Sequence, residues 1–131
     1  ILWYAIVETD EAYLLGYYSF FDKEKAMDFR EIPKQHDIPA DLAATYGVET
    51  YKWLSKGYYN IEQVGSDYLF HDLRFGLMSD PFSLERKDIA YVFTHRIDYG
   101  NPEKPVFART EPEVENPEQI ITSIYNRMLG K

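Results

Sequence analysis

The stretch Lys56–Gly76, KGYYNIEQVGSDYLFHDLRFG, decides the fold because it combines two strand-like arms with a turn between them. The first arm, Gly57–Gln63, is rich in aromatic and β-branched residues, and the second, Tyr68–Phe75, alternates two sets of side chains. Between them, Val64–Asp67 contains Gly65, which is free to take positive φ, and an aspartate that can bond local backbone amides. The stretch therefore predicts a β-hairpin.

The composition of the 131-residue chain limits the classes of function. Lys and Arg number 14 against 22 Asp and Glu, which gives a net charge of -8. Such a surface repels a phosphate backbone, so general nucleic-acid binding is excluded. The chain contains no cysteine, so it has neither a disulfide framework nor a thiolate metal cluster. Its length predicts one domain with one core.

The start of the chain indicates a larger parent protein. The sequence opens at Ile1 with ILWYAIV, without an initiator methionine and without the basic region and cleavage site of a signal peptide. It contains no run of about 18 apolar residues. We therefore expect residues 1–131 to be a single soluble domain cut from a longer membrane protein.

Strand-like runs come before the hairpin. Residues 2–8 and 12–20 are aromatic and aliphatic runs separated by a short polar turn, which predicts an antiparallel pair. Both faces of the second run are largely apolar, which places it inside the sheet, and Gly16 indicates a bulge or a close backbone approach. Residues 27–32 alternate as a third strand, and the proline-bounded segment 33–39 is expected to be a loop.

Two short helices are expected between this region and the hairpin. Residues 41–47 and 48–55 have helical spacing, with Gly47 ending the first helix and Gly57 the second. After the hairpin, residues 78–88 are a polar segment without a clear period.

The last third of the chain predicts two more strands and a helix. Residues 89–99 alternate as a long strand, and residues 106–109 fit a short edge strand. Asn116 is a candidate N-cap with Pro117 in the first helical position. A stripe of isoleucine, tyrosine and methionine side chains follows, and Gly130 ends the helix.

These elements predict an α+β fold. We expect a twisted, mainly antiparallel sheet of about five to seven strands, two short helices before the hairpin, and a C-terminal amphipathic helix packed on one sheet face.

Three histidines are the candidate metal ligands or proton carriers. His36 lies in the proline-bounded loop, whereas His71 and His95 lie on predicted strands among apolar neighbours. No HxH, HExxH or CxxC spacing places two of them on one metal. The first interpretation is a structural histidine at each strand position, and the alternative is a ligand or proton carrier.

Charged residues repeat at a spacing of two on two strands. Asp72 and Arg74 share one strand face, and Arg96 and Asp98 share a face of the later strand. If those strands pair, the four charges form a ladder of structural ion pairs. The alternative is an anion or substrate site, in which the arginines offer forked donors to a carboxylate or a phosphate.

Aromatic residues make up 17% of the chain. The first interpretation is a core built from aromatic rings. The alternative is a surface on which tyrosine and tryptophan dock a glycan or a protein partner.

Three segments together resemble a known family: WLSKGYY at residues 53–59, DLRFG at 72–76 and YVFTHRID at 91–98. They resemble the C-terminal soluble portion of the membrane-bound metal-dependent hydrolases of the YdjM-like family, also described as LexA-binding and inner-membrane-associated. The resemblance covers roughly residues 50 to 100.

The resemblance implies an upstream transmembrane region as the partner of this chain, in a bacterial inner membrane. It also implies a divalent metal held by histidine and aspartate residues of that region, so no metal ligand is carried over to this chain. We expect the chain to gate, support or complete a site formed elsewhere. The candidate residues for such a contribution are Asp72, Arg74, His71, Arg96 and His95. The alternative function is a non-catalytic interaction module.

Overall fold

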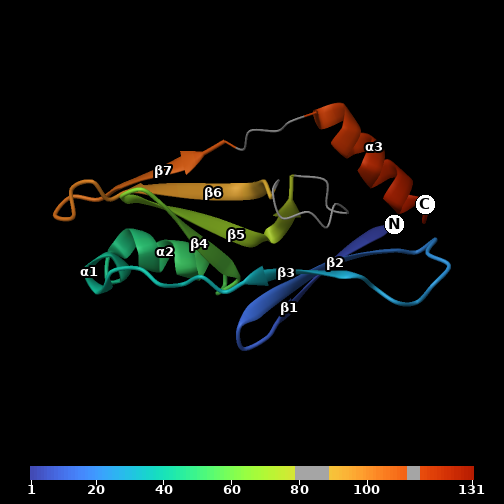
Figure 1. The fold of residues 1–131 in the computed structure, drawn as a ribbon, viewed down its shortest axis with the longest axis horizontal. Coiled ribbons are helices and arrows are strands. Elements are labelled where there is room, and N and C mark those ends of the chain that lie inside the picture. The colour runs from blue at the N-terminus through green and yellow to red at the C-terminus, as the bar shows by residue number, and fades with distance from the viewer. Residues whose placement is uncertain (79–88, 112–115) are drawn as a thin grey trace. The chain divides into compact units, whose positions relative to one another are not determined.

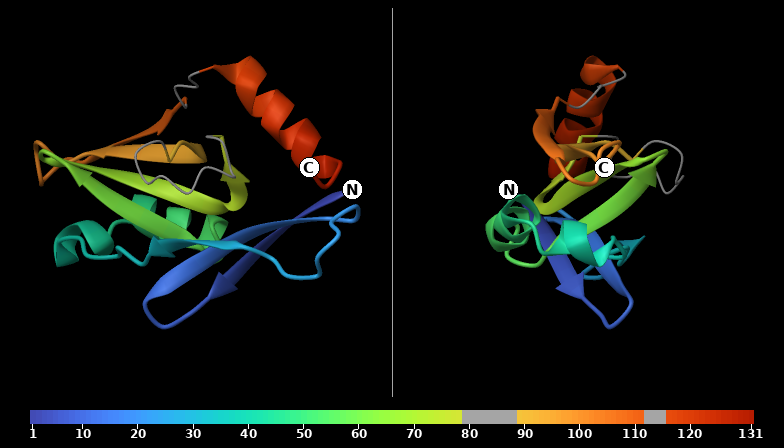
Figure 2. Two further views of the ribbon diagram at one scale, coloured as in Figure 1. Left: turned by 45° about the vertical axis from the view of Figure 1, so that its right-hand side comes forward. Right: turned by 90° about the vertical axis from the view of Figure 1, so that its left-hand side faces the viewer.

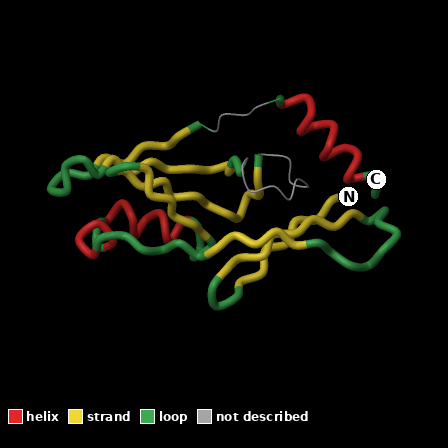
Figure 3. Tube along the Cα trace, in the orientation of Figure 1, coloured by secondary structure: helices red, strands yellow, loops and turns green. Residues whose placement is uncertain are grey.

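The computed structural model describes residues 1–78, 89–111 and 116–131, which contain seven strands and three helices (Figures 1 and 3). The predicted α+β class with antiparallel strands is confirmed. Most of the predicted polar segment at 78–88 lies outside the described residues. In chain order the elements are β1 (Leu2–Glu8), β2 (Ala12–Ser19), β3 (Phe29–Pro33), α1 (Ala40–Ala43), α2 (Tyr46–Leu54), β4 (Tyr59–Val64), β5 (Asp67–Leu77), β6 (Tyr91–Asp98), β7 (Val106–Thr110) and α3 (Pro117–Met128).

The described strands form two sheets, where the sequence predicts one. The first has the order β1-β2-β3 and the second the order β4-β5-β6-β7. The chain also divides into two compact units, each assembled from separate segments of the sequence. The first unit consists of Ile1–Pro33, Gly76–Ala90 and Glu113–Lys131, and the second of Lys34–Phe75 and Tyr91–Pro112. That residues 1–131 are one domain of a longer protein stays a prediction.

The first unit is built around β2, which lies between β1 and β3 as predicted. Tyr13, Leu15 and Ile32 are buried there. Gly16 is approached by a side chain and not, as predicted, by another backbone, because a Cβ at this position would lie 2.5 Å from the Met27 sulfur. A larger residue would therefore displace the Met27 side chain that covers this face of the sheet.

The end of helix α3 lies near the end of β2 (Figure 2), and polar contacts join the two. The Ser19 hydroxyl donates to the Met128 carbonyl at 2.6 Å. The Arg127 guanidinium pairs with Asp22 and donates to the Tyr17 carbonyl at 3.0 Å. Asn116 precedes the helix as predicted, but its backbone is left-handed (φ 52°) and its side chain makes no capping hydrogen bond. The helix is thus fixed to the sheet mainly through its last turn.

The second unit contains the predicted hairpin. Strands β4 and β5 pair in register from Tyr59 opposite Asp72 to Val64 opposite Asp67, and Gly65 in the turn has φ 62°. Helices α1 and α2 cover one face of the four-stranded sheet (Figure 1). The core on that face contains Leu42, Val48, Tyr59, Ile61, Tyr68, Phe70 and Ile97.

Gly47 does not end a helix, contrary to the prediction. Helix α1 ends at Ala43, and α2 begins at Tyr46, with the Thr45 hydroxyl accepting from the Val48 amide. Gly47 therefore lies in the first turn of α2, where a Cβ would lie 2.6 Å from the Phe107 ring. The glycine is needed here for close packing of α2 against β7, and its conformational freedom plays no part.

Gly76, the last residue of DLRFG, has a left-handed backbone conformation that favours glycine. Its φ is +79°, and a Cβ would lie 2.7 Å from the Tyr17 hydroxyl. Gly76→Ala is therefore expected to lower the free energy of unfolding by about 2 kcal/mol, as backbone strain and displacement of Tyr17 add together. Urea unfolding measures the change.

Gly57→Ala is the matched control for Gly76→Ala. Gly57 has nearly the same φ, +83°, but nothing lies within 4 Å of the added Cβ. Gly57→Ala is therefore expected to lower the free energy of unfolding by about 1 kcal/mol, from backbone strain alone. Equal losses for the two variants would contradict a role for the Tyr17 contact.

Candidate functional site

Asp72 and Arg74 on β5 form a two-pronged ion pair. The Arg74 Nε and a terminal nitrogen donate to the two Asp72 carboxylate oxygens at 3.0 and 2.7 Å, and the Arg74 amide donates at 3.1 Å. The Asp72 side chain is 9% exposed and the Arg74 side chain is 26% exposed. Asp72 lies opposite Tyr59, on the face that α2 covers. The carboxylate also raises the pKa of Arg74 through this hydrogen bond. Both groups are thus engaged with each other.

The predicted ladder of four charges is wrong. Arg96 pairs with Asp67 at the start of β5, with its Nε donating at 2.9 Å, and Asp98 accepts instead from the Gly100 amide at 3.0 Å. The two arginines therefore belong to separate pairs. Asp67, which the sequence indicated could bond local turn amides, accepts the amide of Tyr99, the residue that follows β6. Arg96 lowers the pKa of Asp67 through a side-chain hydrogen bond.

His71 is a buried, neutral histidine on the face opposite Asp72. Its ring stacks on Tyr91 with centroids 4.0 Å apart, and its Nδ1 lies 2.8 Å from the Thr94 hydroxyl. Burial lowers the pKa of His71 to about 4. The Glu62 carboxylate is 3.5 Å from Nε2 and would favour a charged ring, but Glu62 is largely exposed and Nε2 makes no hydrogen bond with any described residue. Burial outweighs this screened attraction.

His95 lies on the opposite face of the sheet from His71. Its ring stacks on Tyr51 of α2 with centroids 4.1 Å apart, and its cross-strand partner is Arg109. Burial lowers the pKa of His95, the Arg109 charge lowers it further, and the Asp72 charge opposes both. The two strand histidines therefore do not converge on one site.

The third histidine is also engaged with its surroundings. His36 stacks on Tyr59 with centroids 4.0 Å apart, and its Nε2 lies 2.9 Å from the Tyr59 carbonyl oxygen. Within residues 1–78, 89–111 and 116–131, no three His, Cys, Asp or Glu side chains are grouped so that they could hold a metal ion.

Sequence reasoning missed Arg109 on the edge strand β7. Its guanidinium lies 4.7 Å from the centre of the Phe93 ring, Phe93 meets Phe75 edge to face at 4.6 Å, and Arg74 lies 5.0 Å from the Phe75 ring. Two rings in edge-to-face contact thus lie between two guanidinium groups in one row. The signal in the sequence was Phe93 and Arg109 on adjoining strands, but their register was unknown. The row brings the Arg109 guanidinium close to His95, its cross-strand partner.

Tyr59, Tyr68 and Phe70 near the candidates belong to the core, so the first interpretation holds for these rings. Phe70 stacks on Tyr59 at 4.5 Å and contacts Tyr51 at 5.5 Å. Tyr46 and Trp53 of α2, in contrast, are among the most exposed large side chains described. These two exposed residues are the observation that favours the alternative, a surface that docks a glycan or a protein partner.

Comparison with known proteins adds no relative: no protein-family model, curated protein or solved structure matches the chain. In the part of the chain that the structure describes, no helix is long and apolar enough to cross a membrane.

Proposed function

We propose that the chain is the extramembrane C-terminal domain of a membrane-bound metal-dependent hydrolase. In this proposal it supports a site formed by an upstream membrane region in a bacterial inner membrane, where a divalent metal is held. The DLRFG string, the most specific part of the family resemblance, supports a structural role because Asp72 and Arg74 satisfy each other's charge. Because each charge is already engaged with the other, a structural pair is favoured over a catalytic carboxylate or an anion-binding arginine.

The role of the hairpin in this proposal is to keep the family-specific residues in a rigid sheet. Asp72 accepts three hydrogen bonds from Arg74, Phe70 is stacked in the core, and Gly76 allows the tight backbone after them. Such an arrangement resists rearrangement during a reaction cycle. It suits an element that positions a neighbouring region better than one that carries the reacting groups.

A second candidate function is a non-catalytic interaction module. The exposed Tyr46 and Trp53 on α2 favour it, because both residue types combine a large apolar body with a polar tip. A protein partner or a glycan would then dock on α2. Loss of partner binding in Trp53→Ser, with the stability unchanged, would support this function over the first.

Metal titration tests whether the chain is a self-contained metalloenzyme. Calorimetry of residues 1–131 with Zn²⁺, Mn²⁺ and Mg²⁺ up to millimolar concentrations is expected to give no saturable binding. The longer protein, purified from membranes, is expected to retain a divalent metal. Saturable uptake by residues 1–131 that is lost in His71→Phe or His95→Gln would contradict the supporting role.

The encoded sequence upstream of Ile1 is the direct test of the family assignment. Transmembrane helices that carry histidine and aspartate residues are expected there, together with recovery of the longer protein in the membrane fraction. A longer protein with no such helices would overturn the proposal.

A further inference from the structure

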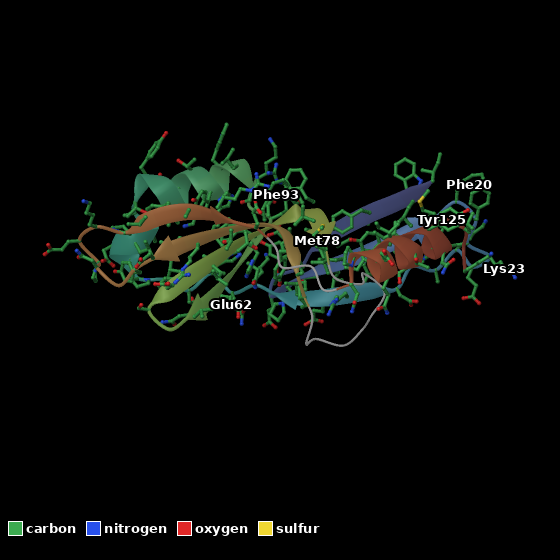
Figure 4. The ribbon with its side chains drawn as sticks, turned by 90° about the horizontal axis from the view of Figure 1, so that it is seen from above. Phe20, Lys23, Glu62, Met78, Phe93 and Tyr125 are labelled. Atoms are coloured by element: carbon green, nitrogen blue, oxygen red, sulfur yellow. The ribbon has the colours of Figure 1, made fainter. Side chains whose placement is uncertain are left out.

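Large apolar side chains are exposed around one end of the first unit, and we call them the tip surface. They are Ile1, Trp3, Phe20, Phe21, Tyr125 and Leu129. Trp3 is 61% exposed and Phe20 72%. Figure 4 shows Phe20 and Tyr125 at the same end of this unit, with Lys23 also there. Exposed apolar groups gathered in this way mark a contact surface.

Direct contacts hold the three segments of the tip surface together. The Phe20 amide donates to the Ile1 carbonyl at 3.0 Å, and the rings of Phe20 and Phe21 meet edge to face with centroids 5.7 Å apart. A Cβ on Gly130, the residue after Leu129, would clash with the Phe21 carbonyl oxygen. The end of α3 therefore touches the backbone of the turn that carries both phenylalanines.

The tip surface surrounds the end of the sheet and is not a flat face. Trp3 pairs with Tyr18, and the next residue, Ser19, points to the other face and bonds α3. Trp3 and α3 therefore lie on opposite faces of the sheet, with Phe20 and Phe21 at its end. An apolar end with this shape can enter a lipid layer, whereas it would make only a small contact with a flat protein surface.

We propose that the tip surface inserts into the boundary between headgroups and acyl chains of a lipid bilayer. Tryptophan and tyrosine favour this layer because their rings are apolar and their tips are polar, and phenylalanine and isoleucine add apolar area. Lys23 and Lys131 lie next to the segments that carry the tip surface, where their ammonium groups can reach lipid phosphates. The inference rests on the proposed function, in which a membrane region lies upstream of Ile1, itself part of this surface.

A second copy of the chain is the competing occupant. Each chain carries a net charge of -8, so self-association brings two strongly acidic molecules together. A zwitterionic bilayer carries no such repulsion. Charge therefore favours the lipid surface, and specifically a neutral one, over a dimer.

The two tryptophans of the chain provide an internal comparison. Trp3 belongs to the tip surface, whereas Trp53 lies on α2 of the other unit and is 76% exposed. Trp53→Phe leaves Trp3 as the only indole, and Trp3→Phe leaves Trp53. On addition of phosphatidylcholine vesicles, the Trp3 emission is expected to shift to the blue and to be quenched by brominated lipid. The Trp53 emission is expected to stay unchanged.

Substitution at the tip gives a second readout. The double variant Phe20→Ser, Phe21→Ser is expected to weaken partitioning into vesicles at least about tenfold, since two exposed rings lose their apolar contact. Tyr46→Ser, which removes an exposed ring from α2, is the matched control and is expected to bind as the parent does. Circular dichroism confirms that both variants fold.

The outcomes separate the possible occupants. Absence of a Trp3 shift at any lipid concentration overturns the inference, and so does a shift of Trp53 alone. A Trp3 shift that rises with protein concentration without vesicles identifies a second copy and also overturns it. Binding only to vesicles that contain phosphatidylglycerol would overturn the preference for a neutral surface. The proposed function fails separately, when the longer protein has no transmembrane helices upstream of Ile1.

Discussion

Replacing Arg74 with alanine is expected to lower the free energy of unfolding by about 3 kcal/mol at pH 7, because the Asp72 carboxylate is then left buried without its partner. Three hydrogen bonds to that carboxylate come from Arg74, and two of them disappear with the side chain. The quarter exposure of Arg74 places the loss at the lower end of the range for buried pairs. Urea unfolding followed by tryptophan fluorescence measures it.

Arg96→Ala is the matched control for Arg74→Ala. It also breaks a two-pronged pair, but Arg96 is 57% exposed, and Asp67 keeps the Tyr99 amide. The expected loss is below about 1 kcal/mol. In a double-mutant cycle, Asp72→Ala with Arg74→Ala should cost clearly less than the sum of the single changes. A fully stable Arg74→Ala protein would contradict the structural role of the pair and restore the anion-site alternative.

Acidification from pH 6.5 to 4 is expected to remove about 3 kcal/mol of stability through His71 alone. Burial lowers the pKa of His71 from 6.5 to about 4. Between these two values the unfolded chain takes up a proton that the folded chain does not, so unfolding becomes easier as the pH falls. Above pH 6.5 neither state binds this proton, and His71 contributes no pH dependence. Below pH 4 both states bind it, so the loss is complete.

His71→Phe is the variant that isolates this effect. It retains an aromatic ring against Tyr91 and removes the titrating group, so the unfolding free energy between pH 6.5 and 4 should become much flatter. Protonation of His95 also lowers the stability as the pH falls, because its pKa is lowered in the folded chain. The variant His95→Gln measures how much of the pH dependence comes from His95. Asp67 acts at lower pH, since its depressed pKa lies below 3.8. An unchanged slope in His71→Phe would show that His71 is not the group responsible.

The fold could be predicted from sequence wherever the signal is local. The hairpin, the inner position of β2 and the C-terminal helix follow from alternation, turn residues and an apolar stripe, all within short windows. The division into two sheets is different, because it depends on which distant strands pair. Gly47 was misread for a related reason: the residue that requires a glycine there is Phe107, sixty positions later in the chain.

The candidate site divides in the same way. Asp72 and Arg74 are two residues apart on one strand, so their pairing could be anticipated from strand geometry. Arg96 pairs with Asp67, which is 29 residues away in the chain. Arg109 lies over Phe93, and this contact depends on a strand register that the local sequence does not determine. His71 and His95 were correctly placed on strands. Which face each one takes, and hence that they do not converge, is a property of the assembled sheet.

The attachment of α3 to the first sheet also fixes an order of events during synthesis. Asp22 and Arg127 are separated by 105 residues, and Ser19 and Met128 by 109. The first sheet leaves the ribosome before the second unit, but the helix that bonds it is translated only after every segment of the second unit. The second unit can therefore mature while the first sheet still lacks its helix. Of the two units, the one whose first segment is made earlier is therefore the later to be completed.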